Sequence, residues 1–306
     1  MSIEFFLPLL AAAVQSGTPV LYATLGEIFT EKSGVLNLGV EGIMMIGALA
    51  AFVTTMLSGS PILGFLVGGC AGAVLSGIHG LVCLVFQGNQ VVSGLALTIF
   101  GVGLADYLGT PYIGQAAPGF NPLPVPILSK IPFLGSVFFN HDSLVYISYI
   151  IPMLMWLFFR YTRWGLGLRA VGEYPPAAIA GGLRVISYRW VGILVGGCLV
   201  GFGGAYLSLA YTHLWTNGLS AGRGWIAVAL VIFAFWDPMR AMVGAYLFGG
   251  VMAFQLRLQA AGTHVPSSLL LMLPYALTVM VLVFSSWKGQ GTEAPAALGV
   301  NIEPPD

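Results

Sequence analysis

Apolar stretches of about 20 residues follow one another along almost the whole chain, separated by short polar or Pro/Gly-rich segments. A helix needs about 20 apolar residues to cross a bilayer, so each full-length stretch predicts a membrane span. The stretch at 225–236 is too short to cross unless the Gly-rich residues before it extend it. The predicted spans are 5–25, 39–57, 62–86, 91–109, 143–159, 190–211, 225–236, 240–257 and 267–287.

The composition supports this pattern. Hydrophobic residues make up 58% of the 306 residues and charged residues 7%, with a mean hydropathy of +0.91. Soluble domains carry about 25% charged residues, so a soluble enzyme is excluded. Eleven basic residues balance eleven acidic ones, which leaves no basic field for nucleic acid. The predicted fold is an all-α polytopic membrane protein of about nine transmembrane helices, with one membrane domain over 1–287.

Basic residues predict the orientation. With the N-terminus outside and the C-terminus inside, eight of the eleven Lys and Arg residues face the cytoplasm, as the positive-inside rule requires. Five of the eight lie in 160–189, which we expect to be a cytoplasmic loop. If 225–236 does not cross, Arg240 and Lys288 change sides.

Two similar segments suggest an internal repeat. Ser60-Pro61 and Asp237-Pro238 each combine a helix-capping residue with proline at the first helical position. A polar, glycine-broken stretch precedes each, at 37–42 and at 220–224. Because the two halves begin on opposite sides, we expect an inverted repeat of four plus four spans around a central helix. Such repeats line a translocation path with broken helices.

Polar residues at the predicted cytoplasmic end have two interpretations. Asn37 and Glu41 form part of a solute pathway, or Glu41 is a helix-start carboxylate stabilised by the helix dipole and by pairing with Lys32. Asn89 and Gln90 lie in a short inner turn, where a turn role is favoured over contact with solute. All four are candidate pathway residues.

Two further candidates lie at the predicted outer side. Asn217 and Arg223 form either an outward polar lip of the pathway or an interfacial anchor. Their flanking residues, Trp215 and Trp225, suit the headgroup level of a membrane, which favours the anchor.

Three segments lie outside the predicted spans. Residues 110–142 hold six prolines and an apolar run, which predicts an outer interfacial segment that could gate the pore. The tail, 288–306, is rich in Pro, Ala and Gly and is expected to be disordered in the cytoplasm. In the loop 160–189, Pro175-Pro176 can open a short helix that Gly181-Gly182 closes. So short a helix needs a docking surface, so we expect either a peg for a cytoplasmic partner or a surface helix.

Catalytic and metal-binding patterns are missing from the sequence. The four histidines share no metal-ligand spacing, and the three cysteines lie in apolar runs. No nucleophile motif and no Gly-x-x-x-x-Gly-Lys-Ser/Thr phosphate loop occurs, so we expect neither a catalytic site nor ATP hydrolysis by this chain. No cofactor is expected.

Three motifs carry a family resemblance. Ser33-Gly-Val-Leu-Asn-Leu-Gly-Val-Glu-Gly42, Asn89-Gln-Val-Val-Ser-Gly94 and Arg169-Ala-Val-Gly-Glu-Tyr-Pro-Pro-Ala-Ala178 occur in that order. Together they resemble the permease subunits of bacterial ABC importers of the ribose and branched-chain amino acid type. The chain is most similar to nucleoside or simple-sugar uptake permeases, over about residues 5–287. Tyr174 departs from the Gly-Glu-Asn-Pro of the family.

The resemblance implies a function and partners. It implies ATP-driven inward transport of a nucleoside or simple sugar by alternating access, across the bacterial cytoplasmic membrane. The partners it implies are a cytoplasmic ATPase subunit, a second permease subunit, a substrate-binding lipoprotein and membrane lipid, but no nucleic acid. It also implies that 169–182 is a coupling helix seated in the ATPase, with Arg169, Gly172, Glu173, Pro175 and Ala178 as coupling residues.

Two alternatives remain open from the residues alone. A self-sufficient ion-coupled transporter would share the repeat but need a buried ion or proton site, for which Glu27, Glu31 and Glu41 are the only material. An intramembrane enzyme would need a nucleophile or metal constellation that the sequence lacks.

Overall fold

The computed structural model describes residues 3–262, 266, 269–270, 272–287 and 294–301. Its described secondary structure is helical, apart from two isolated β-bridges between residues 113–116 and 214–215. Within these described residues, seven helical segments are long and apolar enough to cross a membrane. They span Phe6–Glu31, Val40–Ser58, Pro61–Val85, Gln90–Tyr112, Ser143–Tyr161, Val185–Tyr211 and Pro238–Ala260.

The helices follow the predicted spans closely, except for two. The predicted span 225–236 is an 11-residue helix, and the residues before it form turns rather than a helical extension. The span at 267–287 contains a 15-residue helix, and residues 267–268 and 271 lie outside the described part. The α-helices are α1 (Ile3–Glu31), α2 (Val40–Ser58), α3 (Pro61–Gly80), α4 (Gln90–Gly109), α5 (Leu134–Phe138), α6 (Ser143–Tyr161), α7 (Arg163–Glu173), α8 (Pro175–Ala180), α9 (Val185–Tyr206), α10 (Arg223–Phe233), α11 (Pro238–Ala260) and α13 (Leu273–Trp287).

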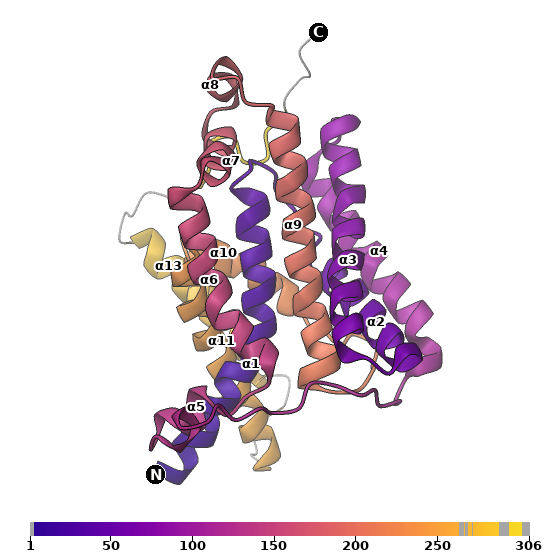
Figure 1. Cartoon of the computed structure of the whole chain (residues 1–306), viewed down its shortest axis with the longest axis vertical. Helices are drawn as coiled ribbons and strands as arrows, with labels where there is room; N and C mark the ends of the chain where they lie inside the picture. Colours follow the sequence, from indigo (N-terminus) through magenta and orange to yellow (C-terminus); the bar gives the residue numbers. More distant parts are fainter. Residues whose placement is uncertain (1–2, 263–265, 267–268, 271, 288–293, 302–306) are drawn as a thin grey trace.

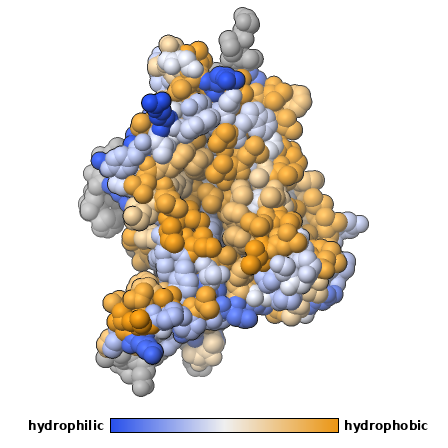
Figure 2. Space-filling view, in the orientation of Figure 1, coloured by the Kyte–Doolittle hydropathy of each residue, from blue (hydrophilic) through white to orange (hydrophobic). Residues whose placement is uncertain are grey.

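The long helices form a bundle around α1, which packs along α9, α10 and α11 (Figure 1). Helices α2, α3 and α4 lie on one side of it, with α3 packed along both α2 and α9. One end of the bundle carries α5 and the opposite end carries α7 and α8; we call them the α5 end and the α8 end (Figure 1). Apolar residues cover much of the surface between the ends, and strongly hydrophilic residues gather toward them (Figure 2). This distribution is typical of a protein surrounded by lipid.

Small residues let the central helices approach closely. A Cβ added at Gly47 of α2 would lie 2.7 Å from Cα of Gly201 in α9, and one at Gly201 would lie 2.5 Å from the carbonyl oxygen of Gly68 in α3. These distances leave no room for a side chain, so α2, α3 and α9 meet backbone to backbone. Such contact supplies the van der Waals packing that holds helices together in lipid.

Both predicted Pro-start helices are confirmed. The Ser60 hydroxyl accepts the Leu63 amide at the start of α3, and the Asp237 carboxylate accepts the Met239 and Arg240 amides at the start of α11. The predicted disorder of the tail is wrong for residues 294–301. These residues are ordered against the α8 end, and Ala297 is buried, because backbone and side-chain groups of four other segments bind them.

Candidate functional site

Residues 32–39 lead from the end of α1 into the interior of the bundle. The Thr98 hydroxyl donates to the carbonyl of Leu38 at 2.8 Å, and a Cβ at Gly42 would lie 2.9 Å from Cα of Thr98. Thr98 is near the middle of α4, so α2 begins about halfway along a spanning helix rather than at its end. The predicted position of Glu41 at the mouth of a span is therefore wrong, because eight non-helical residues carry the chain inward first.

Glu41 binds the start of a second interrupted helix, α10. Its carboxylate accepts the Ser220 hydroxyl at 2.5 Å, the Gly222 amide at 2.8 Å and the Gly224 amide at 2.6 Å. The side chain is 7% exposed. Amides at a helix N-terminus lack partners within the helix and carry the positive end of its dipole, so a carboxylate satisfies both needs. Glu41 is thus a helix-start carboxylate, but the amides that it binds belong to α10.

The helices α2 and α10 run in opposite directions from this meeting point. Along α2, the Phe52 ring packs 6.3 Å from the ring of Tyr112, which lies just beyond α4 at the α5 end. Just beyond α10, the indole of Trp236 donates to the carboxylate of Glu31 at the α8 end of α1. The 19-residue helix α2 and the 11-residue helix α10 therefore place their N-termini side by side in the interior, with the Glu41 carboxylate between them. This arrangement lines ion and solute sites in transporters.

Arg223 lies inside the bundle rather than on an outward lip. It is 8% exposed, donates to the carbonyl of Ser220 at 3.1 Å, and stacks 5.3 Å from the centre of the Tyr211 ring. Trp215 is fully buried, so the predicted interfacial anchor is wrong at that position. Asn217 is exposed, and it is the neighbouring Gly218 amide that binds the carboxylate of Asp106. The loop before α10 folds inward, which its composition did not reveal.

Asn37 belongs to a buried polar cluster beside Glu41. The backbone amide of Asn37 donates to the Glu27 carboxylate at 3.1 Å, and the side-chain oxygen of Asn37 accepts the Gly39 amide at 2.9 Å. Its side-chain nitrogen lies 3.4 Å from the hydroxyl of Ser76 on α3. These bonds hold the non-helical turn that directs the chain into α2.

Asn89 and Gln90 support the turn at the start of α4. Asn89 caps the helix by accepting the Val92 amide at 3.0 Å. Gln90 is buried, accepts the Leu36 amide at 2.8 Å and donates to Asn301 at 2.9 Å. Gln90 therefore joins the α3–α4 turn to the loop 32–39 and to the ordered tail.

The predicted short helix after Pro175 is confirmed as α8, and Gly182 follows it with φ +80°. Its two faces differ. Pro175 and Ala178 are buried, Ala178 in a small core with Val171 of α7 and Val185 of α9. Those predicted coupling residues, with the buried Gly172, are not accessible to a partner.

The accessible side of the α7–α8 segment includes two of the predicted coupling residues, Arg169 and Glu173. Tyr174 is 64% exposed and Ile179 is 46% exposed, and Arg169 and Glu173 are also exposed. Sequence reasoning missed Tyr174 and Ile179 as surface residues. The available signal was the spacing of three residues between Pro175 and Ala178, which places both on one face of a helix and Ile179 off that face.

Helix α7 rests directly on the loop that leads to Glu41. A Cβ at Gly172 would lie 2.3 Å from the carbonyl oxygen of Lys32, so the two backbones touch. The tail bridges the same segments, because the Ala297 amide donates to Gly172 at 2.9 Å and the Gly299 amide donates to Gly34 at 3.2 Å. A continuous set of contacts therefore links α8, α7, the loop 32–39, Glu41 and α10.

Comparison with known proteins identifies the family. Residues 9–282 match the family described as "Branched-chain amino acid transport system / permease component". The nucleoside ABC transporter permease protein NupC of Lactococcus lactis subsp. cremoris is 36% identical over 300 residues, which cover 93% of each chain. The guanosine ABC transporter permease protein NupQ of Bacillus subtilis is 31% identical over 305 residues, 94% of each. TsgC13 of Haloferax volcanii, provisionally named a glucose ABC transporter permease protein, is 42% identical over 84% of this chain and 79% of its own.

Proposed function

Because the chain belongs to the branched-chain amino acid transport permease family and is an ABC transporter permease, we propose that it carries a nucleoside or simple sugar inward by alternating access. Energy comes from ATP bound to a separate subunit. The proposed orientation places the α8 end in the cytoplasm, where the basic loop 160–189 satisfies the positive-inside rule. The segment 212–222 with α10, and α13, complete nine crossings.

The contact between Gly172 and the Lys32 carbonyl carries this proposal. It places α7 against the loop whose other end fixes α2 and Glu41. Glu41 in turn holds the start of α10. A displacement of α8 by an ATPase subunit would therefore reach the starts of α2 and α10 in the interior, and ATP-bound and free states would favour different positions of these two helices. Helices α2 and α10 are the proposed moving parts of the two repeats.

The accessible surface of α7 and α8 is the proposed ATPase contact. This surface combines an apolar centre with a charged rim, the usual anatomy of a protein interface. The centre is formed by the exposed Tyr174 and Ile179, and the rim by the exposed Arg169 and Glu173. The buried residues, Gly172, Pro175 and Ala178, support this surface from below. A second permease subunit and an outer binding protein complete the proposed transporter in the bacterial cytoplasmic membrane.

The proposed cargo rests on the relatives. NupC and NupQ are named for nucleoside and guanosine transport, and TsgC13 for glucose. Nucleosides and simple sugars both contain a sugar ring that carries hydroxyl groups. Ion-coupled transport is not favoured, since the relatives named above are ABC permeases and since Glu27, Glu31 and Glu41 each bind a donor from the protein itself.

Uptake by the reconstituted transporter tests the proposal. The chain is incorporated in proteoliposomes with its ATPase, paired permease and binding protein, and uptake of labelled guanosine and glucose is measured with and without ATP. We expect Ile179→Glu to lower ATP-dependent uptake at least tenfold, and to lower ATPase co-purification, because it places a charge in an apolar contact. Leu123→Glu is the matched control, since Leu123 is exposed and its amide donates to the carbonyl of His141, which follows α5 at the opposite end.

Two results would contradict the proposal. Full uptake and normal ATPase co-purification by the Ile179→Glu transporter would remove the docking role of α8. Uptake by this chain alone, driven by an ion gradient without ATP, would replace ATP-driven transport by the ion-coupled alternative.

A further inference from the structure

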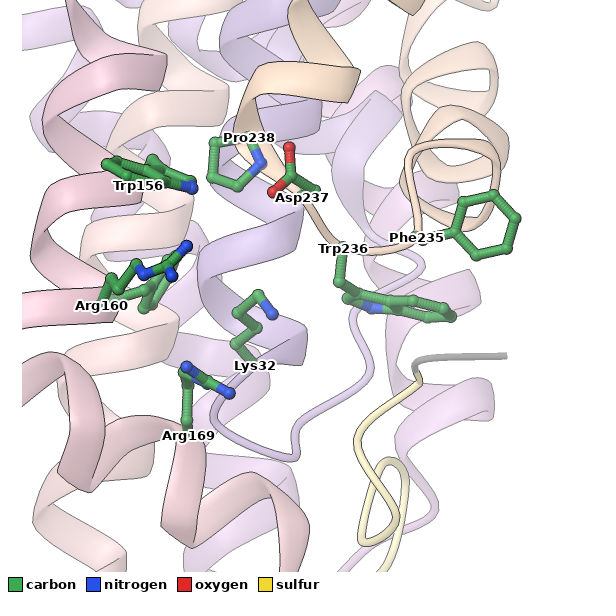
Figure 3. Close-up of a pocket in the computed structure, with 9 residues that line it drawn as sticks. Lys32, Trp156, Arg160, Arg169, Phe235, Trp236, Asp237 and Pro238 are labelled. Atoms are coloured by element: carbon green, nitrogen blue, oxygen red, sulfur yellow. The ribbon is translucent and has the colours of Figure 1, made fainter. Parts of the chain in front are cut away.

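A basic cavity lies at the α8 end, away from Glu41. It has a volume of about 430 Å³ and is lined by the ends of α1 and α6, by α7 and by the turn between α10 and α11. Figure 3 shows the basic ends of Lys32, Arg160 and Arg169 lying near one another, with Asp237 on the other side of the cavity. This volume falls in the range of small-ligand sites, about 300–1,000 Å³.

The charge of the lining favours an anion. Three basic side chains face one acidic side chain, a balance of +2. The carboxylate of Asp237 already accepts the Met239 and Arg240 amides at the start of α11, both at 2.9 Å. Guanidinium and ammonium groups converging on one space match a phosphate group, which accepts several charged hydrogen bonds at once.

Aromatic rings hold these cations against apolar walls. The Lys32 ammonium lies 5.6 Å from the centre of the Phe159 ring, and the Arg160 guanidinium lies 5.3 Å from that of Trp156. Phe159 and Trp236 are each only 4% exposed. These ring contacts position the Lys32 and Arg160 cations beside buried apolar walls, where both can bind one anion.

The surface beside the cavity identifies the ligand as an amphiphile. On α6, Met153 lies one turn before Trp156 and is 57% exposed. On α11, Val243 follows Asp237 by less than two turns and is 67% exposed. Both belong to membrane-spanning helices, and α6 and α11 pack together. A phosphate in the cavity would therefore have apolar surface within reach for acyl chains.

We infer that this cavity binds the phosphate headgroup of an anionic glycerophospholipid, whose acyl chains lie along α6 and α11. Basic pockets between spanning helices are suited to such headgroups. The cavity lining shares no residue with the cluster around Glu41, although Lys32 also begins the loop 32–39 that leads to that cluster. Because Arg169 also belongs to the proposed ATPase contact, a bound lipid would lie directly beneath that contact.

Lipid retention by the purified chain tests the inference. The chain is mixed in detergent with phosphatidylglycerol or phosphatidylcholine of identical acyl chains, and bound lipid is counted by native mass spectrometry. We expect preferential retention of phosphatidylglycerol. Changing Lys32→Gln and Arg160→Gln together should weaken that retention about 25-fold, because each basic residue contributes roughly fivefold. The matched control changes Arg163→Gln and Arg184→Gln, which carry the same charge outside the cavity.

The single variant Arg160→Gln tests the lipid site if the double variant fails to fold. Because Arg160 is exposed, this variant should fold, and it should weaken retention of phosphatidylglycerol about fivefold. Equal retention of the two lipids, or equal losses in the test and control variants, would overturn the inference. Displacement of the lipid by millimolar inorganic phosphate would show a free-anion site instead. Unchanged lipid retention with loss of ATPase co-purification in the double variant would assign the cavity to an acidic segment of the partner.

Discussion

Replacing Glu41 by glutamine tests the contact that joins the two interrupted helices. The substitution keeps the shape of the side chain but replaces one carboxylate oxygen by a hydrogen-bond donor. Glu41 receives one hydroxyl and two amide donors at 2.5–2.8 Å while 7% exposed, so little water can replace a lost partner. The best orientation of the amide keeps the donors from Ser220 and Gly222 and leaves the Gly224 amide facing an NH2 group.

The expected loss follows from these three bonds. A hydrogen bond to a charged group contributes about 1.5–3 kcal/mol, and a neutral one about 1 kcal/mol. Losing one charged bond and weakening two others therefore lowers the free energy of unfolding by about 4 kcal/mol. We expect Glu41→Gln to show this loss in equilibrium unfolding in mixed detergent micelles. Asp106→Asn is the control, because Asp106 on α4 receives a single amide donor, from the exposed Gly218, and the variant should lose less than about 1 kcal/mol.

A double-mutant cycle isolates the pairwise contribution. Combining Glu41→Gln with Ser220→Ala should give a coupling energy of about 1–2 kcal/mol, because the two side chains are in direct contact. A loss below about 1 kcal/mol for Glu41→Gln would show that the carboxylate does not hold α10, and the proposed link from α7 to α10 would fail with it.

Two further predictions concern the same chain of contacts. Gly224→Ala should destabilise the protein and lower transport, because the added Cβ would lie 2.5 Å from Cα of Glu41. Gly103→Ala on α4 is the control: it has open space around it and should be neutral or slightly stabilising. Equal midpoints of thermal unfolding for the two variants would contradict the close packing at Gly224. Ending the chain at residue 293 should speed hydrogen exchange in α7 and α8, since the bonds to Gly172 and Glu173 are lost, while a chain ending at residue 301 should exchange as the full chain does. Equal exchange in both truncated chains would show that the ordered tail does not hold α7.

Hydropathy, together with capping residues, proline and glycine at helix ends, predicted most helices. An apolar stretch must be shielded from water whatever its neighbours are, and capping residues act on the next three amides, so both signals are local. For this reason the starts of α3 and α11 and the short helix α8 were predictable from Pro and Gly positions. The family motifs also led us to predict functional roles for the residues around Glu41 and in α8.

The partners of the polar residues were not predictable in the same way. Glu41 was expected to interact with its own helix or with Lys32, yet its donors lie about 180 residues away, at Ser220, Gly222 and Gly224. The burial of Ala178 was likewise not predictable, because it depends on α7 and α9. A residue type fixes which bonds a side chain can make, while packing fixes which of them it does make.

The sequence by itself determined three things: that this is a membrane protein, at which residues most of its helices begin, and to which permease family it belongs. Hydrophobicity, capping and motifs are properties of neighbouring residues, so the sequence alone carries them. Only the tertiary structure decided that the chain folds inward before α2 and α10, that residues 294–301 bind the α8 end, and that three basic side chains share one cavity. Each of these depends on segments far apart in the chain, whose meeting is set by close helix packing and by the need to satisfy buried polar groups.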